Sequence, residues 1–297
     1  MWNTRSNLAI TLGISLAMLL WGVNNVAIRF MVQNWPPMFT AVTRMMCISA
    51  ILLAVLRWTR WLGEPKKLSR ELHWEIWRKA GTWQACFVVL FSYALVYTTA
   101  ARVGLFLAAS PVWAVLLELK SEGRRSRKYF AACLAGIGVG ILLLPALDKA
   151  GGDIRGDLLA LGSTLAWVMF GRQCKGLGKH LSGVEVTGHT MWRAALLMSP
   201  WALYEAATRP MIATPWLFTV QSYCIVFGGV IAFSLHYHAL RFWPMSRVFL
   251  WGNLLPITTM AAAWFILDEA VSATFWISIT LVATAVAIGQ KVTPTKS

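Results

Sequence analysis

The sequence predicts an all-α integral membrane protein with ten transmembrane helices arranged as two inverted five-helix repeats. Its composition, its apolar segments and an internal repeat support this prediction. Of the 297 residues, 58% are hydrophobic and 13% are charged, whereas a soluble domain has about 45–50% apolar and about 25% charged residues. The chain has too few charged residues to cover a water-exposed surface. Ten spans of about 20 residues each would leave only short connections and no separate soluble catalytic domain.

Ten apolar segments, bounded by charged residues or by Pro and Gly, are each close to the length of a membrane-spanning helix. None shows the alternating pattern of a β-barrel strand. The first segment has no small-x-small cleavage site, so we expect it to be retained as a span. The segments are residues 8–29, 38–57, 80–99, 102–119, 129–147, 157–173, 184–204, 216–240, 245–266 and 273–291. Turn residues separate several of them: Pro36-Pro37, Gly151-Gly152 and Thr214-Pro215.

The net charge of +15 has two interpretations. Clustered Lys and Arg are typical of nucleic-acid binding, but cytoplasmic loops of membrane proteins also accumulate them. With a cytoplasmic amino terminus, most of the 27 Lys and Arg residues fall in cytoplasmic loops. We therefore expect a multi-pass protein of the inner (plasma) membrane, with both termini in the cytoplasm and no nucleic-acid partner. The five cysteines form no CxxC pair, so we expect neither a metal site nor a cofactor.

The two halves of the chain, residues 1–150 and 151–297, share a faint internal repeat. Matching residues recur at a constant offset of 145 positions. The matches are Ala94-Leu95 with Ala239-Leu240, Arg102-Val103 with Arg247-Val248, Leu105 with Leu250, and Pro111 with Pro256. Each half holds five predicted spans, an odd number, so the second half enters the membrane from the opposite side. Many secondary transporters are built from inverted repeats of this kind, with the substrate site near the membrane midplane.

Several motifs along the chain resemble the EamA-type drug/metabolite transporters, and the resemblance covers nearly the whole sequence. These are the run Leu20 to Arg29, the Pro36-Pro37 turn, Arg44, Ser110-Pro111-Val112, Gly156 to Trp167, and Leu255-Pro256 followed by Asp268-Glu269. The resemblance implies a ten-helix fold with a central cavity that exports a small metabolite or an amino acid. The sequence departs from the family pattern in one place. Glu269 follows Pro256 by 13 residues, but Arg124 stands at the equivalent distance after Pro111.

Four arginines lie within or at the edge of predicted spans: Arg44, Arg102, Arg193 and Arg247. An ionisable group at bilayer depth requires a partner or a function. Arg102 and Arg247 open helices, where the guanidinium and the helix dipole together would suit a carboxylate or phosphate. The alternative is that they reach the interface or bind loop carbonyls. Arg193 shares a helix face with Glu185 and His189, as either an inward polar stripe or an internal salt-bridge ladder.

Two histidines in the eighth segment, His236 and His238, point to different sides of a helix, so at most one can face a central cavity. Histidine titrates near neutral pH and could carry a proton, or it could simply bind a backbone carbonyl. Few acidic residues lie in the spans, which argues against a sodium or proton site built on a midplane carboxylate. The other candidate lining residues are Trp21, Asn24, Asn25, Tyr93, Tyr97, Trp167, Trp251 and Asn253.

These observations predict a secondary transporter that exports an amino acid or related organic acid by alternating access. The alternatives are a membrane-embedded enzyme or a metabolite sensor that does not transport. No HExxH or GxSxG motif is present in the sequence, so we expect no enzymatic activity. The expected partners are a small-molecule substrate and the lipid bilayer, with the protein as a monomer or homodimer.

Overall fold

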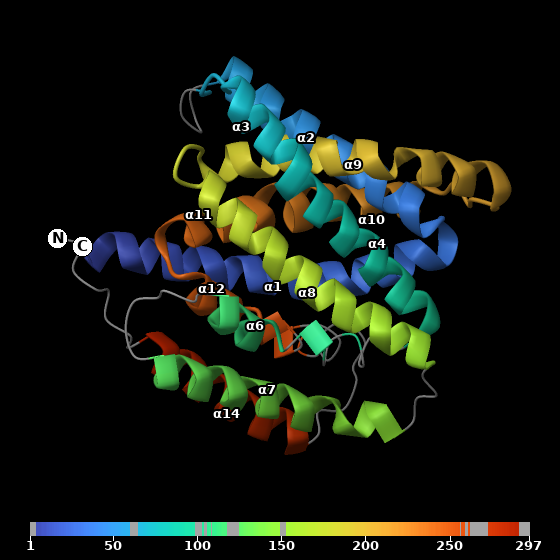
Figure 1. Cartoon of the computed structure of the whole chain (residues 1–297). Helices are drawn as coiled ribbons and strands as arrows, with labels where there is room; N and C mark the ends of the chain where they lie inside the picture. The colour runs from blue at the N-terminus through green and yellow to red at the C-terminus, as the bar shows by residue number, and fades with distance from the viewer. Residues whose placement is uncertain are drawn as a thin grey trace. The chain divides into compact units, whose positions relative to one another are not determined.

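The computed structural model describes residues 4–59, 65–98, 103, 106–107, 109–117, 125–148, 153–255, 257–258, 261 and 273–290. These residues form helices and turns, without a strand among them (Figure 1). The helices of the amino-terminal half are α1 (Thr4–Asn34), α2 (Pro37–Trp58), α3 (Arg70–Glu75), η1 (Ile76–Gly81), α4 (Thr82–Tyr97), α6 (Ser110–Leu117) and α7 (Arg125–Asp148). Those that follow are α8 (Ile154–Leu177), α9 (Gly183–Thr208), α10 (Pro215–Ile225), η2 (Val226–Ile231), α11 (Ala232–Phe242), α12 (Met245–Trp251) and α14 (Ala273–Gln290).

Local sequence chemistry explains where several helices begin. Helices α2 and α10 begin with a proline at the first helical position, where the missing N–H costs nothing. The Thr214 side chain also accepts a hydrogen bond from the Leu217 N–H at the start of α10. Helix α9 begins with a capping box, in which Ser182 and Glu185 each bind the other's backbone N–H. The turns predicted at Pro36-Pro37 and Thr214-Pro215 are therefore present.

Two long helices each contain one turn of π-helix. Segments α3, η1 and α4 run continuously over 28 residues, as do α10, η2 and α11. The first begins at Arg70, about ten residues before the start of the predicted span at residue 80. The predicted start of this helix is too late because charged residues interrupt the apolar pattern in its first turns. The Ser69 hydroxyl accepts from the Leu72 N–H and caps the helix at this earlier point.

The chain divides into two compact units. Unit 1 comprises residues 1–89 and 169–242, and unit 2 comprises residues 90–168 and 243–297. Each unit combines segments from both halves of the sequence. The division at residue 150 follows the sequence repeat, and these units do not test it, so it stays a prediction.

In unit 1, α2 packs against α9, and α1 packs against α10, η2 and α11. Small residues allow the close approach of α2 and α9. The Ser49 hydroxyl donates to the Gly188 carbonyl oxygen at 2.6 Å, and a Cβ atom at Gly188 would lie 3.1 Å from Leu53. At one end of the unit, Met31, Trp35 and Leu217 form a buried apolar cluster. The contact between α1 and α10–η2 brings intramembrane polar residues together.

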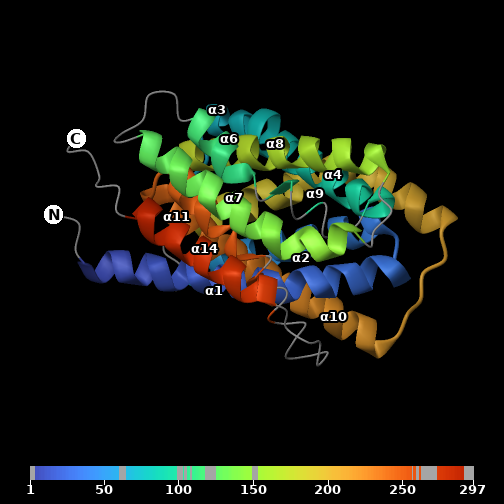
Figure 2. The ribbon, with the colours of Figure 1, turned by 90° about the horizontal axis from the view of Figure 1, so that it is seen from below.

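In unit 2, α7 and α14 lie side by side, as the views in Figures 1 and 2 both show. Helix α12 packs against α6, α7 and α14. A buried cluster of Ala94, Val103 and Ala160 joins α4, α8 and the residues before α6. The small side chains of this cluster allow close helix packing.

Four helical segments are long and apolar enough to cross a membrane: residues 7–34, 37–58, 70–97 and 215–242. They coincide with the first, second, third and eighth predicted spans. The all-α class is thus confirmed for the described residues. The count of ten spans and the inversion of the second repeat stay predictions.

Candidate functional site

A line of polar side chains lies in unit 1, where α10 and η2 face α1 and α2. We call Asn24, Arg44, Gln221 and Cys224 the polar stripe. Gln221, Cys224 and Gly228 are spaced by three and four residues, which puts them on one helix face. The Gln221 side-chain Nε2 donates to the Thr40 carbonyl oxygen at 3.1 Å and to the Thr43 hydroxyl at 3.2 Å. These residues therefore connect α10 to α2 by polar contacts.

Three atoms of the polar stripe are buried and have no hydrogen-bond partner among the described residues: Arg44 Nη1, Gln221 Oε1 and Asn24 Oδ1. Arg44 interacts electrostatically with the Cys224 thiol. Within the described part of the chain, no carboxylate lies within 4 Å of its guanidinium. Buried polar atoms without partners cost free energy, more so when the group is charged. The stripe therefore has unused capacity to bind a polar ligand.

The π-helical turn η2 brings Trp21, Asn24 and His236 together. The Trp21 indole N–H donates to the Gly228 carbonyl oxygen at 2.9 Å, and the Trp21 ring centroid lies 5.0 Å from that of His236. A Cβ atom at Gly228 would overlap the Asn24 amide, so glycine is required for this approach. His236 is buried, whereas His238 is exposed. Only one of the two histidines faces inward, as their helical spacing predicts.

Arg193 lies away from the polar stripe, where α9 meets α3 and η1. Its Nη1 donates to the His189 carbonyl oxygen at 2.6 Å, and its Nη2 donates to His73 Nδ1 at 2.8 Å. Because a guanidinium only donates, His73 Nδ1 is the acceptor in this hydrogen bond. The guanidinium also lies 4.3 Å from the centroid of the Trp192 ring and 5.7 Å from that of Trp77. These contacts compensate the fully buried charge of Arg193.

Glu185, which shares a helix face with Arg193, caps the start of α9. One carboxylate oxygen accepts from the Ser182 N–H at 2.7 Å and the other from the Lys66 N–H at 2.8 Å. Lys66 Nζ also donates to the His180 carbonyl oxygen at 2.7 Å. Both carboxylate oxygens are thus used to fasten the segment before α3 to the turn between α8 and α9. Of the two interpretations of this face, these contacts favour a structural role, although without the salt-bridge ladder.

The remaining candidates are distributed over both units. Asn25 is half-buried on α1 in unit 1. In unit 2, Tyr93 is half-buried, and Tyr97 is exposed at the end of α4. The Trp167 ring centroid lies 5.9 Å from that of Phe249 on α12.

At the end of α12, Trp251 is buried, and its Nε1 has no partner among the described residues. Both side-chain polar atoms of Asn253, close by in the chain, are also buried without a partner there. Unit 2 therefore contains a second group of unsatisfied polar atoms.

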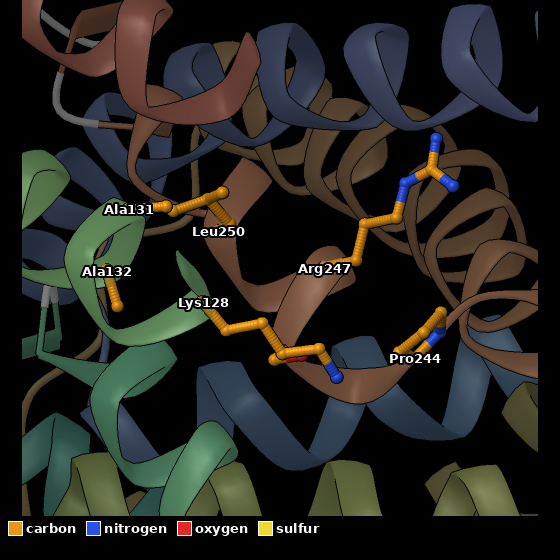
Figure 3. A pocket seen from close by; sticks show the side chains of 7 residues that line it. Lys128, Ala131, Ala132, Pro244, Arg247 and Leu250 are labelled. Atoms are coloured by element: carbon orange, nitrogen blue, oxygen red, sulfur yellow. The ribbon is translucent and has the colours of Figure 1, made fainter. Parts of the chain in front are cut away.

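Arg247 lines a small pocket in unit 2 together with Lys128 and Ser246 (Figure 3). Its guanidinium lies 3.7 Å from the centroid of the Trp243 ring. The pocket has a volume of about 20 Å³, which is room for about one water molecule and too little for a metabolite. Figure 3 shows the charged ends of Lys128 and Arg247 pointing to different sides in this view. Arg102, predicted as the repeat equivalent of Arg247, lies outside the described residues, as does Glu269.

Gln221 and Cys224 were not among the residues predicted from the sequence. The residues predicted from the sequence are charged residues, histidines, aromatic residues and the amides Asn24, Asn25 and Asn253. An amide in the middle of an apolar segment, three residues before a cysteine and seven before Gly228, was the available signal. Gln221 lies opposite Thr40 and Thr43, far away in the sequence, so only the packing of α10 on α2 reveals the stripe.

The chain is similar to known proteins over most of its length. A transporter of Archaeoglobus fulgidus, described as uncharacterized, is 23% identical over 261 residues, which cover 86% of this chain and 88% of the relative. The uncharacterized transporter YetK of Bacillus subtilis is 22% identical over 262 residues, covering 86% of this chain and 79% of the relative. A protein of known crystal structure superposes with a TM-score of 0.77 at 17% identity, over 94% of this chain and 96% of that chain. The last comparison shows a shared fold.

The sequence profile of the EamA-like transporter family matches residues 8–145 and 154–288. The two matches agree with the two repeats seen in the sequence, and the apolar helices agree with a multi-pass membrane protein. Because these matches cover most of the chain, the protein belongs to the EamA-like transporter family.

Proposed function

We propose that the protein is a secondary transporter that exports a small metabolite by alternating access, with an amino acid or related organic acid as its substrate. Membership of the EamA-like family supports transport, and transporters are generally not enzymes. We place it in the inner membrane with both termini in the cytoplasm, as a monomer or homodimer. A non-transporting metabolite sensor is the second candidate, because a buried polar stripe can bind a ligand whether or not the helices then move it.

The proposed substrate class rests on the surroundings of the Arg44 side chain. Its Nη1 is buried without a partner among the described residues, and its guanidinium interacts electrostatically with the Cys224 thiol. Arg193 is fully buried, donates to His73 and His189 and stacks on two tryptophans, while its Nε is buried without a partner among the described residues. A guanidinium pairs best with a carboxylate, through charge-assisted hydrogen bonds. Arg44 therefore supports an anionic substrate, whereas Arg193 supports the packing of α9.

Counterflow in reconstituted vesicles tests this proposal. Vesicles containing the protein are loaded with unlabelled amino acids or organic acids, and uptake of the same labelled solute is followed. We expect counterflow of at least one carboxylate solute. Binding without counterflow would support the sensor, and a chemically altered solute would support an enzyme; either outcome would overturn the transport proposal.

The variant Arg44→Gln tests the anion site. Loss of one charged hydrogen bond weakens binding roughly 10- to 100-fold, so the concentration for half-maximal counterflow should rise by about that factor. Arg44→Lys keeps the charge and should recover part of the affinity. Arg172→Gln, at an exposed position on α8, is the matched control. Unchanged counterflow in a folded Arg44→Gln protein would show that Arg44 does not bind the substrate.

A further inference from the structure

A hydrogen bond joins a buried arginine of α9 to an exposed histidine of α3. Arg193 Nη2 donates to His73 Nδ1 at 2.8 Å, although the two residues are 120 positions apart in the sequence. Arg193 is fully buried, whereas His73 is exposed. His73 also precedes the apolar segment that was predicted to begin at residue 80, so its ring can exchange protons with water.

A proton and Arg193 compete for the same lone pair of His73. A guanidinium only donates, so His73 Nδ1 carries no proton while it accepts this hydrogen bond. Histidine gains its second proton close to neutral pH. Both ring nitrogens of the resulting imidazolium are donors, so the bond to Arg193 cannot form. The bond is therefore present at higher pH and is lost as the pH falls.

The charges around His73 do not compensate an imidazolium in this position. Within the described residues, no carboxylate lies within 4 Å of a His73 ring nitrogen. Glu185 accepts two backbone N–H groups, and Glu75 pairs with Lys79 at 3.0 Å. A protonated His73 would instead face the positive charge of Arg193. The titratable and charged side chains on the adjoining turns are Glu185, His189 and Arg193 on α9, and Glu71, Glu75 and Lys79 on α3 and η1.

Loss of the bond to His73 changes the whole contact between these helices. Arg193 Nε is already buried without a partner among the described residues, and Nη1 is used by the His189 carbonyl oxygen. Without His73, Nη2 also loses its acceptor, and a buried charged donor without an acceptor costs free energy. The guanidinium must then move or admit water. Trp77 follows His73 by one helical turn, and its ring packs edge-on against that of Trp192 at 5.2 Å, so this contact is disturbed as well.

We propose that His73 and Arg193 form a pH-sensitive latch, which holds α3 and η1 on α9 at neutral and higher pH and releases them when His73 gains a proton. The latch lies at the start of the helix over residues 70–97, next to the π-helical turn η1. π-Helical turns are frequent at functional sites. Release frees this end of the helix to move relative to α9. The latch goes beyond the proposed function, because it requires no substrate.

Thiol labelling at the contact with α9 tests the latch. In the full-length protein with its native cysteines replaced by alanine, Ala80→Cys places a thiol at a buried position of η1, which packs against α9. Labelling by a small methanethiosulfonate reagent is measured from about pH 8 to about pH 5.5, a range that brackets the titration of histidine. The same measurement is made with His73→Gln, because glutamine can accept from Arg193 but does not titrate. The ratio of the two rates cancels the pH dependence of the thiol itself.

We expect similar rates at the upper end of this pH range. At the lower end, labelling with His73 present should be roughly tenfold faster than with His73→Gln, the factor expected for the loss of one charged hydrogen bond. A ratio that stays constant over the range would show that protonation of His73 does not open the contact. Absence of labelling at low pH would show that η1 stays on α9. Either result would overturn the inference.

Thermal unfolding provides a second measurement that does not require Ala80→Cys to fold. Acidification over the same range should lower the unfolding midpoint of the unaltered protein more than that of His73→Gln. His180→Gln is the matched control and should behave like the unaltered protein, because His180 is also exposed but contacts Lys66 through its backbone carbonyl oxygen. Equal acid shifts for the unaltered protein and His73→Gln would contradict the latch. Neither measurement uses a substrate, so failure of the latch would leave the transport proposal standing.

Discussion

At the scale of single residues, two arginines of unit 1 have different surroundings. Arg193 donates to His73 and His189 and stacks on two tryptophans, so its charge is compensated within the protein. Arg44 interacts electrostatically with Cys224, and its buried Nη1 has no partner among the described residues. Arg193 is fully buried, whereas Arg44 is half-buried, and their neighbours differ. These neighbours support a structural role for Arg193 and leave substrate binding by Arg44 as a proposal.

The role of Arg193 leads to a stability prediction. Arg193→Gln removes the bond to His73 and the contact with Trp192, and we expect it to destabilise the protein by about 3 kcal/mol. The measurement is the thermal unfolding midpoint of the purified protein in detergent. Arg172→Gln, at an exposed site, should leave the midpoint unchanged. If Arg193→Gln instead abolished ligand binding at an unchanged midpoint, Arg193 would belong to the binding site.

At the scale of elements, two helices at equivalent positions in the sequence repeat have the same length and each contain a π-helical turn. The helix over residues 70–97 and the helix over residues 215–242 both have 28 residues and begin 145 positions apart, the offset of the repeat. Each contains a π-helical turn, η1 over residues 76–81 and η2 over residues 226–231. The turns lie at different depths along their helices. Gly228 in η2 allows Asn24 and Trp21 of α1 to approach closely.

Glycine also sets the distance between α9 and α11. A Cβ atom at Gly183 would lie 2.6 Å from the His238 nitrogen and 2.8 Å from the Ser234 carbonyl oxygen. Gly183→Ala must displace backbone, so we expect a loss of about 1–3 kcal/mol in stability. Gly176→Ala is the control, because nothing lies within 4 Å of a Cβ atom there, and alanine should stabilise α8 slightly. Equal thermal unfolding midpoints for the two variants would contradict the predicted close contact.

At the scale of the whole molecule, the distribution of charge predicts how the chain is inserted. The segment before α3 contains Lys66 and Lys67 and lies on the predicted cytoplasmic side, whereas the segment between α9 and α10 lies on the predicted outer side. Two loops on opposite sides of the membrane can be distinguished by a reagent that does not cross it. The inverted arrangement of the repeats depends on this assignment.

Single cysteines at these two loops test the topology. In a cysteine-free background, Ala213→Cys should react with an impermeant maleimide in intact cells, because Ala213 is exposed on the predicted outer side. Lys67→Cys, also exposed, should react only after the cells are permeabilised. The reverse pattern would mean that the amino terminus is outside, and reaction of both in intact cells would rule out the predicted number of spans between them.

The sequence by itself determined the membrane class, the helical content and most helix boundaries. Hydropathy and turn chemistry are local, so the turns at Pro36-Pro37 and Thr214-Pro215 could be recognised from neighbouring residues. The family was recognisable for the same reason, since its motifs keep their order along the chain. The start of α3 was predicted late, because its first turns are polar and a cap at Ser69 decides the boundary.

Only the tertiary structure decided which polar residues satisfy one another. Arg44 and Arg193 look equivalent in the sequence, but Arg193 meets His73, some 120 positions away, and Arg44 meets Cys224. Gln221 gains its direction from Thr40 and Thr43 on another helix. Helix packing brings such residues together from distant parts of the chain, and the cost of a buried polar atom depends on those neighbours rather than on its own residue type.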